Sequence, residues 1–141
     1  MGRILCLDVG ERRVGIAISD ELGIVASPVG FVRRGPRELD ELRTLLDRYG
    51  AERLVAGLPV GLSGWEGPQA EAVRAFADAT AAALALPLAY WDERLTSTMA
   101  ERSLVASGSR RAKRREQIDA VAAAIILQSY LDHLRWSEAR G

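Results

Sequence analysis

Short apolar runs separated by turn-forming residues dominate the first third of the chain, and a helical spacing follows them. Residues 3–9 are rich in Ile, Leu and Val, which is typical of a buried strand. Leu39, Leu42, Leu45 and Leu46 follow a helical spacing between a proline and a glycine. By the same criteria we predict strands at residues 3–9, 14–19, 25–32, 53–57 and 88–91, and helices at about 36–50, 68–85 and 116–134, with a further helix capped by Thr96 or Ser97.

This order of elements predicts an α/β fold. Three strands joined by tight turns give an antiparallel unit, and the later strands, each reached through a helix, add to it in parallel. We therefore expect a mixed five-stranded sheet with helices on both faces. The order βββαβαβ followed by helices is that of the ribonuclease H-like fold, which by itself does not define an activity. The 141 residues show no repeat or linker, so we predict one domain, residues 1–141.

Three acids lie at the ends of apolar elements. Asp8 ends the first strand, Glu93 follows the fifth, and Asp119 precedes residues 120–127, a run without polar side chains. Because an isolated buried charge is costly, such carboxylates need a cation, a donor or a metal. Together they could form an oxygen-liganded site for Mg²⁺ or Mn²⁺. The alternative is that each is paired separately, and Asp119 could simply favour the start of its helix.

Asp92 and Glu93 directly follow the predicted strand 88–91, and if the strand continues through them their side chains point to opposite faces. Asp92 would share a face with Tyr90, and Glu93 would share the other with Trp91. Only one of the two acids is therefore a candidate ligand while the strand stays regular. A bulge or early turn near the strand end could still bring both together.

The charges balance overall, but the cations cluster. Nineteen basic residues match nineteen acidic ones, so net charge alone suggests no polyanionic partner. Residues 108–115, by contrast, form a predicted polar loop shortly before Asp119, and a cluster of cations there suits a phosphodiester backbone. A solvated loop is the alternative. The cations are Arg110, Arg111, Lys113, Arg114 and Arg115, and Arg12, Arg13, Arg33 and Arg34 could extend the patch.

Other features narrow the class of protein. Cys6 is the only cysteine and lies in an apolar run, so no disulfide framework is expected. No signal peptide is recognisable and no apolar stretch reaches the ~18 residues of a membrane span, so we expect a soluble, cytoplasmic protein. Trp65 lies in a glycine-rich loop, where it could stack on a base or pack locally.

The combined motifs resemble the YqgF/RuvX family. They are L-D-V-G-x-x-R-x-G-I-A-x-S-D at 7–20, G-L-P at 57–59, D-E-R-L-T-S at 92–97 and I-D-A-V-A-A-A-I-I-L-Q-S-Y-L at 118–131. Members are ribonuclease H-like proteins described as pre-16S rRNA nucleases and as Holliday-junction-resolvase homologues. The resemblance implies catalytic acids at Asp8, Glu93 and Asp119, with Arg94 and Thr96 in the flanking motif.

Residues and resemblance together predict a nuclease that hydrolyses phosphodiester bonds with Mg²⁺ or Mn²⁺ held by the three acids. The expected role is 5′-end processing of pre-16S rRNA in ribosome biogenesis. A Holliday-junction resolvase in DNA recombination and repair, or a non-catalytic nucleic-acid-binding module, are the alternatives. Three acids in a groove that binds phosphates would repel the substrate and would not help a protein that only binds it. This argues against the non-catalytic binding module. The sequence does not decide whether the protein forms a homodimer, whether it cuts RNA or DNA, or whether it cuts internally or from an end. It also leaves open which metal is bound and whether Asp92 contributes to the site.

Overall fold

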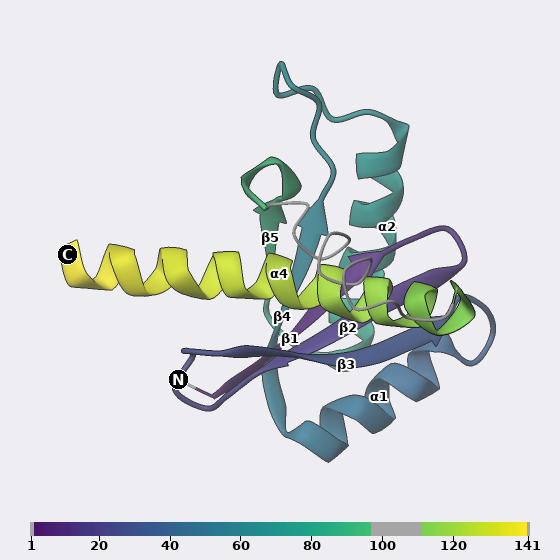
Figure 1. Ribbon diagram of the computed structural model, residues 1–141. Helices are drawn as coiled ribbons and strands as arrows, with labels where there is room; N and C mark the ends of the chain where they lie inside the picture. The colour runs from purple at the N-terminus through teal and green to yellow at the C-terminus, as the bar shows by residue number, and fades with distance from the viewer. Residues whose placement is uncertain (1, 97–110, 141) are drawn as a thin grey trace.

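The computed structural model describes residues 2–96 and 111–140 and shows a five-stranded mixed sheet (Figure 1). The strand order is β3-β2-β1-β4-β5. Pairs β1/β2 and β2/β3 are antiparallel, whereas β1/β4 and β4/β5 are parallel. The strands are β1 (Arg3–Val9), β2 (Arg13–Ser19), β3 (Ala26–Arg33), β4 (Ala51–Leu58) and β5 (Leu88–Asp92). The prediction of a mixed five-stranded sheet is thus confirmed.

Helices cover both faces of this sheet. One face packs against α1 (Glu38–Tyr49) and α2 (Pro68–Leu84), and the other is crossed by α4 (Arg111–Arg140) (Figure 1). The alternation of β1 divides its side chains between two cores. Leu5 and Leu7 belong to the core under α1 and α2, whereas Ile4 and Cys6 belong to the core under α4. The next residue of the second set is Asp8, so its side chain belongs to the α4 face.

Helix α4 differs from its prediction at both ends. It begins at Arg111 and ends at Arg140, instead of spanning residues 116–134. The cations of residues 111–115 therefore lie on a helix and not in a loop. Arg, Lys and Ala are good helix formers, so a cluster of cations is compatible with helix. Arg110 lies outside the described residues, as does the body of the helix predicted after Thr96.

None of the helices within residues 2–96 and 111–140 is long and apolar enough to cross a membrane.

Candidate active site

Two glycines open space around Asp8 on the α4 face of the sheet. Gly15 is the partner of Asp8 on β2, and Gly57 lies beside it on β4, one residue beyond the pair Leu7–Ala56. A Cβ atom on Gly15 would collide with the backbone carbonyl of Asp119. A Cβ atom on Gly57 would lie 2.7 Å from Glu93 Oε1. Both glycines therefore allow the other two acids to approach Asp8.

Glu93 reaches Asp8 from the end of β5. The strand ends at Asp92, and a short 3-10 helix, η1 (Glu93–Leu95), follows. The carboxyl groups of Glu93 and Asp8 lie close enough for each to change the pKa of the other. A proton on Glu93 would be placed to bind the Asp8 carboxylate as well.

The surroundings raise the pKa of both acids. Burial is the main cause for Glu93, and the charge of Asp8 adds to it, so the pKa of Glu93 rises to about 7. Burial also raises the pKa of Asp8, and the charge of Asp119 raises it further, while the hydrogen bond from Glu93 acts in the opposite direction. Two carboxyl groups that compete for one proton in a half-buried site are poised to accept a cation.

Asp119 is the ninth residue of α4, beyond its first two turns, and is paired with Arg13. Because the first turn of α4 holds no acid, the dipole at the helix start does not explain the position of Asp119. The Nε atom of Arg13 lies 2.9 Å from Asp119 Oδ2. This approach is not aligned as a hydrogen bond, and among the described residues this buried oxygen has no hydrogen-bond partner. Burial raises the pKa of Asp119 and Arg13 lowers it, with burial dominant. Asp119 is thus close enough to Asp8 to raise the pKa of Asp8, and it is itself held in an ion pair with Arg13 of β2.

Asp92 is engaged elsewhere. Its carboxylate accepts from the backbone N–H of Arg94 at 2.9 Å, which caps η1, and lies 2.6 Å from Arg94 Nη2. Hydrogen bonding to Arg94 lowers the pKa of Asp92. The two neighbours have different partners: Asp92 meets Arg94, and Glu93 lies next to Asp8. The turn into η1 contributes to this separation, because β5 ends at Asp92 and Glu93 is no longer part of the strand. Thr96 donates its hydroxyl to the backbone carbonyl of Glu93 at 2.7 Å and so braces the turn that carries this acid.

The chemical type of these three donors, carboxylate oxygen, fits a hard divalent cation. Carboxylate oxygens are the ligands that Mg²⁺ and Mn²⁺ prefer. The neighbouring carboxyl groups of Asp8 and Glu93, and Asp119 Oδ2, which has no hydrogen-bond partner, are acid oxygens that a cation would satisfy. In the described part of the chain, however, no three His, Cys, Asp or Glu side chains already surround one point as ligands would. Release of Asp119 from Arg13 would be the adjustment needed.

Arginines gather beside this site. Arg12, Arg13, Arg33 and Arg34 line a cavity of about 450 Å³ together with Glu11. The guanidinium groups of Arg13 and Arg33 lie over the ring of Phe31 at 5.5 and 5.7 Å, which fixes their direction. The side chains of Arg111, Lys113, Arg114 and Arg115 are not described, and only their place in α4 is known.

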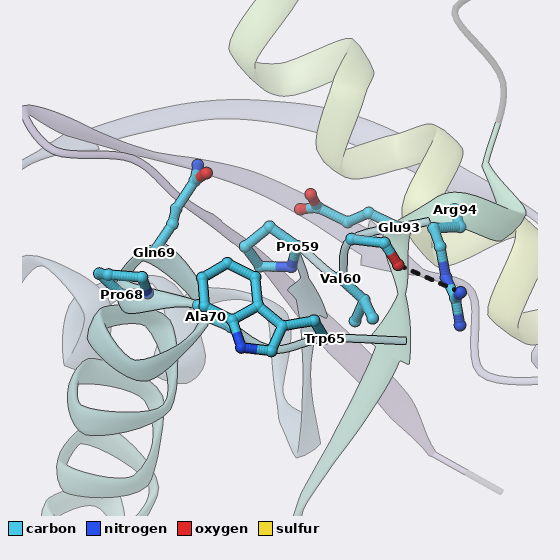
Figure 2. Close-up of a pocket in the computed structure, with 10 residues that line it drawn as sticks. Pro59, Val60, Trp65, Pro68, Gln69, Ala70, Glu93 and Arg94 are labelled. Atoms are coloured by element: carbon cyan, nitrogen blue, oxygen red, sulfur yellow. Dashed lines mark hydrogen bonds between the residues drawn. The ribbon is translucent and has the colours of Figure 1, made fainter. Parts of the chain in front are cut away.

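A cleft of about 540 Å³ opens on the other side of Glu93 (Figure 2). Its walls include Trp65, Gln69 and Arg94, and Arg94 Nη1 donates to the carbonyl of Gly61 at 3.2 Å. The sequence pattern leaves open whether Trp65 stacks on a ligand or packs locally, and it does not identify Gln69 or the role of Gly57 as a spacer. The local signals for these two residues are Pro68, which starts α2 directly before Gln69, and the glycine at the end of the apolar run of β4.

Comparison with known structures first defines the fold class. RuvC of T. thermophilus in complex with a Holliday junction substrate superposes with a TM-score of 0.59 over 97% of each chain, at 14% identity. At this identity the likeness concerns the fold alone, which is the RuvC-like form of the ribonuclease H fold, as predicted.

Sequence comparison then defines the family. The family model RuvX, described as Holliday junction resolvase, matches residues 2–133. A protein of Desulfitobacterium hafniense named "Putative pre-16S rRNA nuclease" is 44% identical over 94% of each chain. A protein of Moorella thermoacetica with the same name is 48% identical over 94% of this chain and 96% of its own. The chain belongs to the RuvX family.

Proposed function

We propose that this protein is a metal-dependent nuclease that hydrolyses phosphodiester bonds, with pre-16S rRNA as its physiological substrate. The observation that carries the proposal is the approach of Glu93 to Asp8 across Gly57, on the face of the sheet where the backbone of Asp119 lies against Gly15. Family membership supports the reaction class, and the name shared by the relatives of 44% and 48% identity supports the substrate.

Asp8, Glu93 and Asp119 are the residues that would hold Mg²⁺ or Mn²⁺. When bound, the cation supplies positive charge that stabilises the charge developing on the phosphate. Asp8 anchors the site because it lies at the end of the central strand β1. Glu93 has a raised pKa, and it would have to be ionised to act as a ligand. Arg13, which pairs with Asp119, is a cation placed beside the site and could also meet a phosphate oxygen.

The substrate strand is expected to follow the cations around these acids. Arg12, Arg13, Arg33 and Arg34 lie on one side and Arg94 on the other. Arg111, Lys113, Arg114 and Arg115 belong to the start of α4, and Arg110 lies outside the described residues. Contacts of this kind go to the phosphate backbone and position the substrate without reading its sequence.

Cleavage of a Holliday junction is the second candidate, because the matching family model carries that description. Paired cuts across a junction require two active sites, so this function would also require a homodimer.

A metal-dependent cleavage assay distinguishes the two. Purified protein is incubated with Mg²⁺ or Mn²⁺ and with precursor rRNA, single-stranded RNA, duplex and four-way-junction substrates of matched sequence. We expect cleavage of the precursor rRNA that stops when the metal is chelated. Preferred paired cleavage of the junction would support the second candidate, and no cleavage of any substrate with either metal would contradict both.

A further inference from the structure

An exposed tryptophan lies next to the acid pair. The loop between β4 and α2 carries Trp65, whose side chain keeps 67% of its surface exposed. Figure 2 shows its ring beside the start of α2, with Glu93 and Arg94 on the opposite side of the cleft. A large exposed aromatic side chain in a cleft forgoes the stabilisation that burial would give it. Its position is therefore better explained by a ligand than by packing.

The loop that presents Trp65 is held at several points. The backbone N–H of Gly61 donates to the carbonyl of Trp65 at 2.8 Å, which closes the loop. Arg94 donates to the carbonyls of Gly61 and Leu62 at 3.2 and 3.3 Å. These contacts tie the loop to the turn that carries Glu93, so the position of Trp65 is coupled to that of the acid.

Gly67 leaves room for the indole ring. A Cβ atom at this position would lie 2.5 Å from ring atom Cζ3 and 2.6 Å from Cη2 of Trp65. No real Cβ atom tolerates such contacts, so the ring can lie against the backbone here only because residue 67 is glycine. The indole is thus supported from behind by the backbone, while most of its surface remains open to solvent.

We propose that this cleft binds one unpaired nucleobase of the strand that is cut, stacked on Trp65. The cleft volume of about 540 Å³ is within the range of small-ligand sites, about 300–1,000 Å³. Stacking on an aromatic side chain is the usual way to hold a base of a single strand. The amide of Gln69 can hydrogen-bond the edge of the base, and Arg94 can meet the adjoining phosphate.

The proposal rests on the proposed nuclease function and adds a requirement to it. Because Glu93 is a wall of the same cleft, a base held by Trp65 places its neighbouring phosphate at the acid pair. Unpaired bases would then be preferred at one position beside the cut, since a base in a regular duplex cannot enter the cleft.

Binding of single-stranded RNA without divalent cations tests this directly, because no cleavage interferes. A labelled RNA is compared with a series in which one abasic position is moved along the strand. We expect the wild type to lose affinity by about 5- to 150-fold at one position. The variant Trp65→Ala should lose as much with the intact RNA and should be indifferent to that abasic position, whereas Trp65→Phe should keep most of the affinity.

Leu62→Ala is the matched control, because Leu62 lies on the same loop, is 98% exposed and does not line the cleft. It should behave as the wild type. The proposal is overturned if the wild type is indifferent to every abasic position, or if Trp65→Ala retains the full abasic penalty. A parallel cleavage assay with Mn²⁺ separates this from the proposed function: cleavage without any abasic effect contradicts only the base site. An abasic effect that depends on Trp65, without cleavage, contradicts only the nuclease.

Discussion

The carboxyl group of Glu93 approaches that of Asp8 although the two residues belong to parts of the chain that are not neighbours in the sheet. Asp8 ends β1 and Glu93 follows β5, and β4 lies between these strands in the sheet. The contact is made across Gly57 of β4, which has no side chain on the α4 face to obstruct it. The acid pair therefore depends on Asp8, Gly57 and Glu93, which come from three different parts of the sheet. Each of these residues can be tested separately.

Asp8→Asn removes one ligand charge and nearly preserves the shape of the side chain. Loss of outer contacts of a metal site typically costs about 10–100-fold in activity or affinity, so loss of a direct ligand should cost more than about 100-fold in cleavage rate. Folding should survive, because the substitution also removes a raised-pKa carboxyl group from a half-buried site. Asp47→Asn, at an exposed acid on α1, is the control and should cleave as the wild type. A folded Asp8→Asn protein with the wild-type rate would refute the metal role.

Gly57→Ala should disturb the acid pair by steric contact with Glu93. The added methyl group would lie 2.7 Å from Glu93 Oε1 and 2.8 Å from Ile126 Cδ1, so one or both must move. We expect a loss of about 1–3 kcal/mol in the free energy of unfolding, as for other overpacked sites, together with weaker Mn²⁺ binding. Urea unfolding and calorimetry measure the two effects. If the loss of Mn²⁺ binding acts through Glu93, adding Glu93→Gln to Gly57→Ala should cause little further loss. Fully additive losses would mean that Gly57 acts independently of this acid.

Much of this arrangement could be predicted from the sequence, but the contacts between distant residues could not. Apolar runs identified the five strands, and strand alternation assigned Glu93 to the face of Trp91. The pairing of Asp119 with Arg13 arises only because α4 crosses β2, a relationship that no local pattern encodes. The start of α4 at Arg111 was missed because charge clustering was interpreted as a loop, whereas Arg and Lys also favour helix.

The stability of the protein without divalent cations should depend on pH through Glu93. Its pKa is about 7 in the folded protein, above the ordinary value of 4.5. Between these values the folded state binds more protons than the unfolded state, so the free energy of unfolding decreases as the pH rises and levels off above about 7. Glu93→Gln should remove this part of the decrease. Urea midpoints of both proteins from pH 4.5 to 8 measure it, and parallel curves would contradict the raised pKa. Addition of Mn²⁺ at pH 8 should raise the wild-type midpoint more than that of the variant.

The cations at the start of α4 should contribute to nucleic-acid binding through phosphate contacts. Because Arg111, Lys113, Arg114 and Arg115 lie on a helix, Gln is the suitable replacement: it removes the charge and retains helix propensity. Each phosphate contact that is lost should flatten the slope of log affinity against log salt by about 0.7 for single strands and 0.9 for duplex DNA.

The quadruple Gln variant should also bind unrelated sequences more weakly by the same factor, because phosphate contacts carry no sequence information. Arg43→Gln with Arg48→Gln is the control, since both lie on α1, on the opposite face of the sheet from α4. That pair should leave the salt slope unchanged. If the quadruple variant and the control have the same slope as the wild type, the basic segment is solvated surface, and the substrate strand must follow the remaining cations, Arg12, Arg13, Arg33, Arg34 and Arg94.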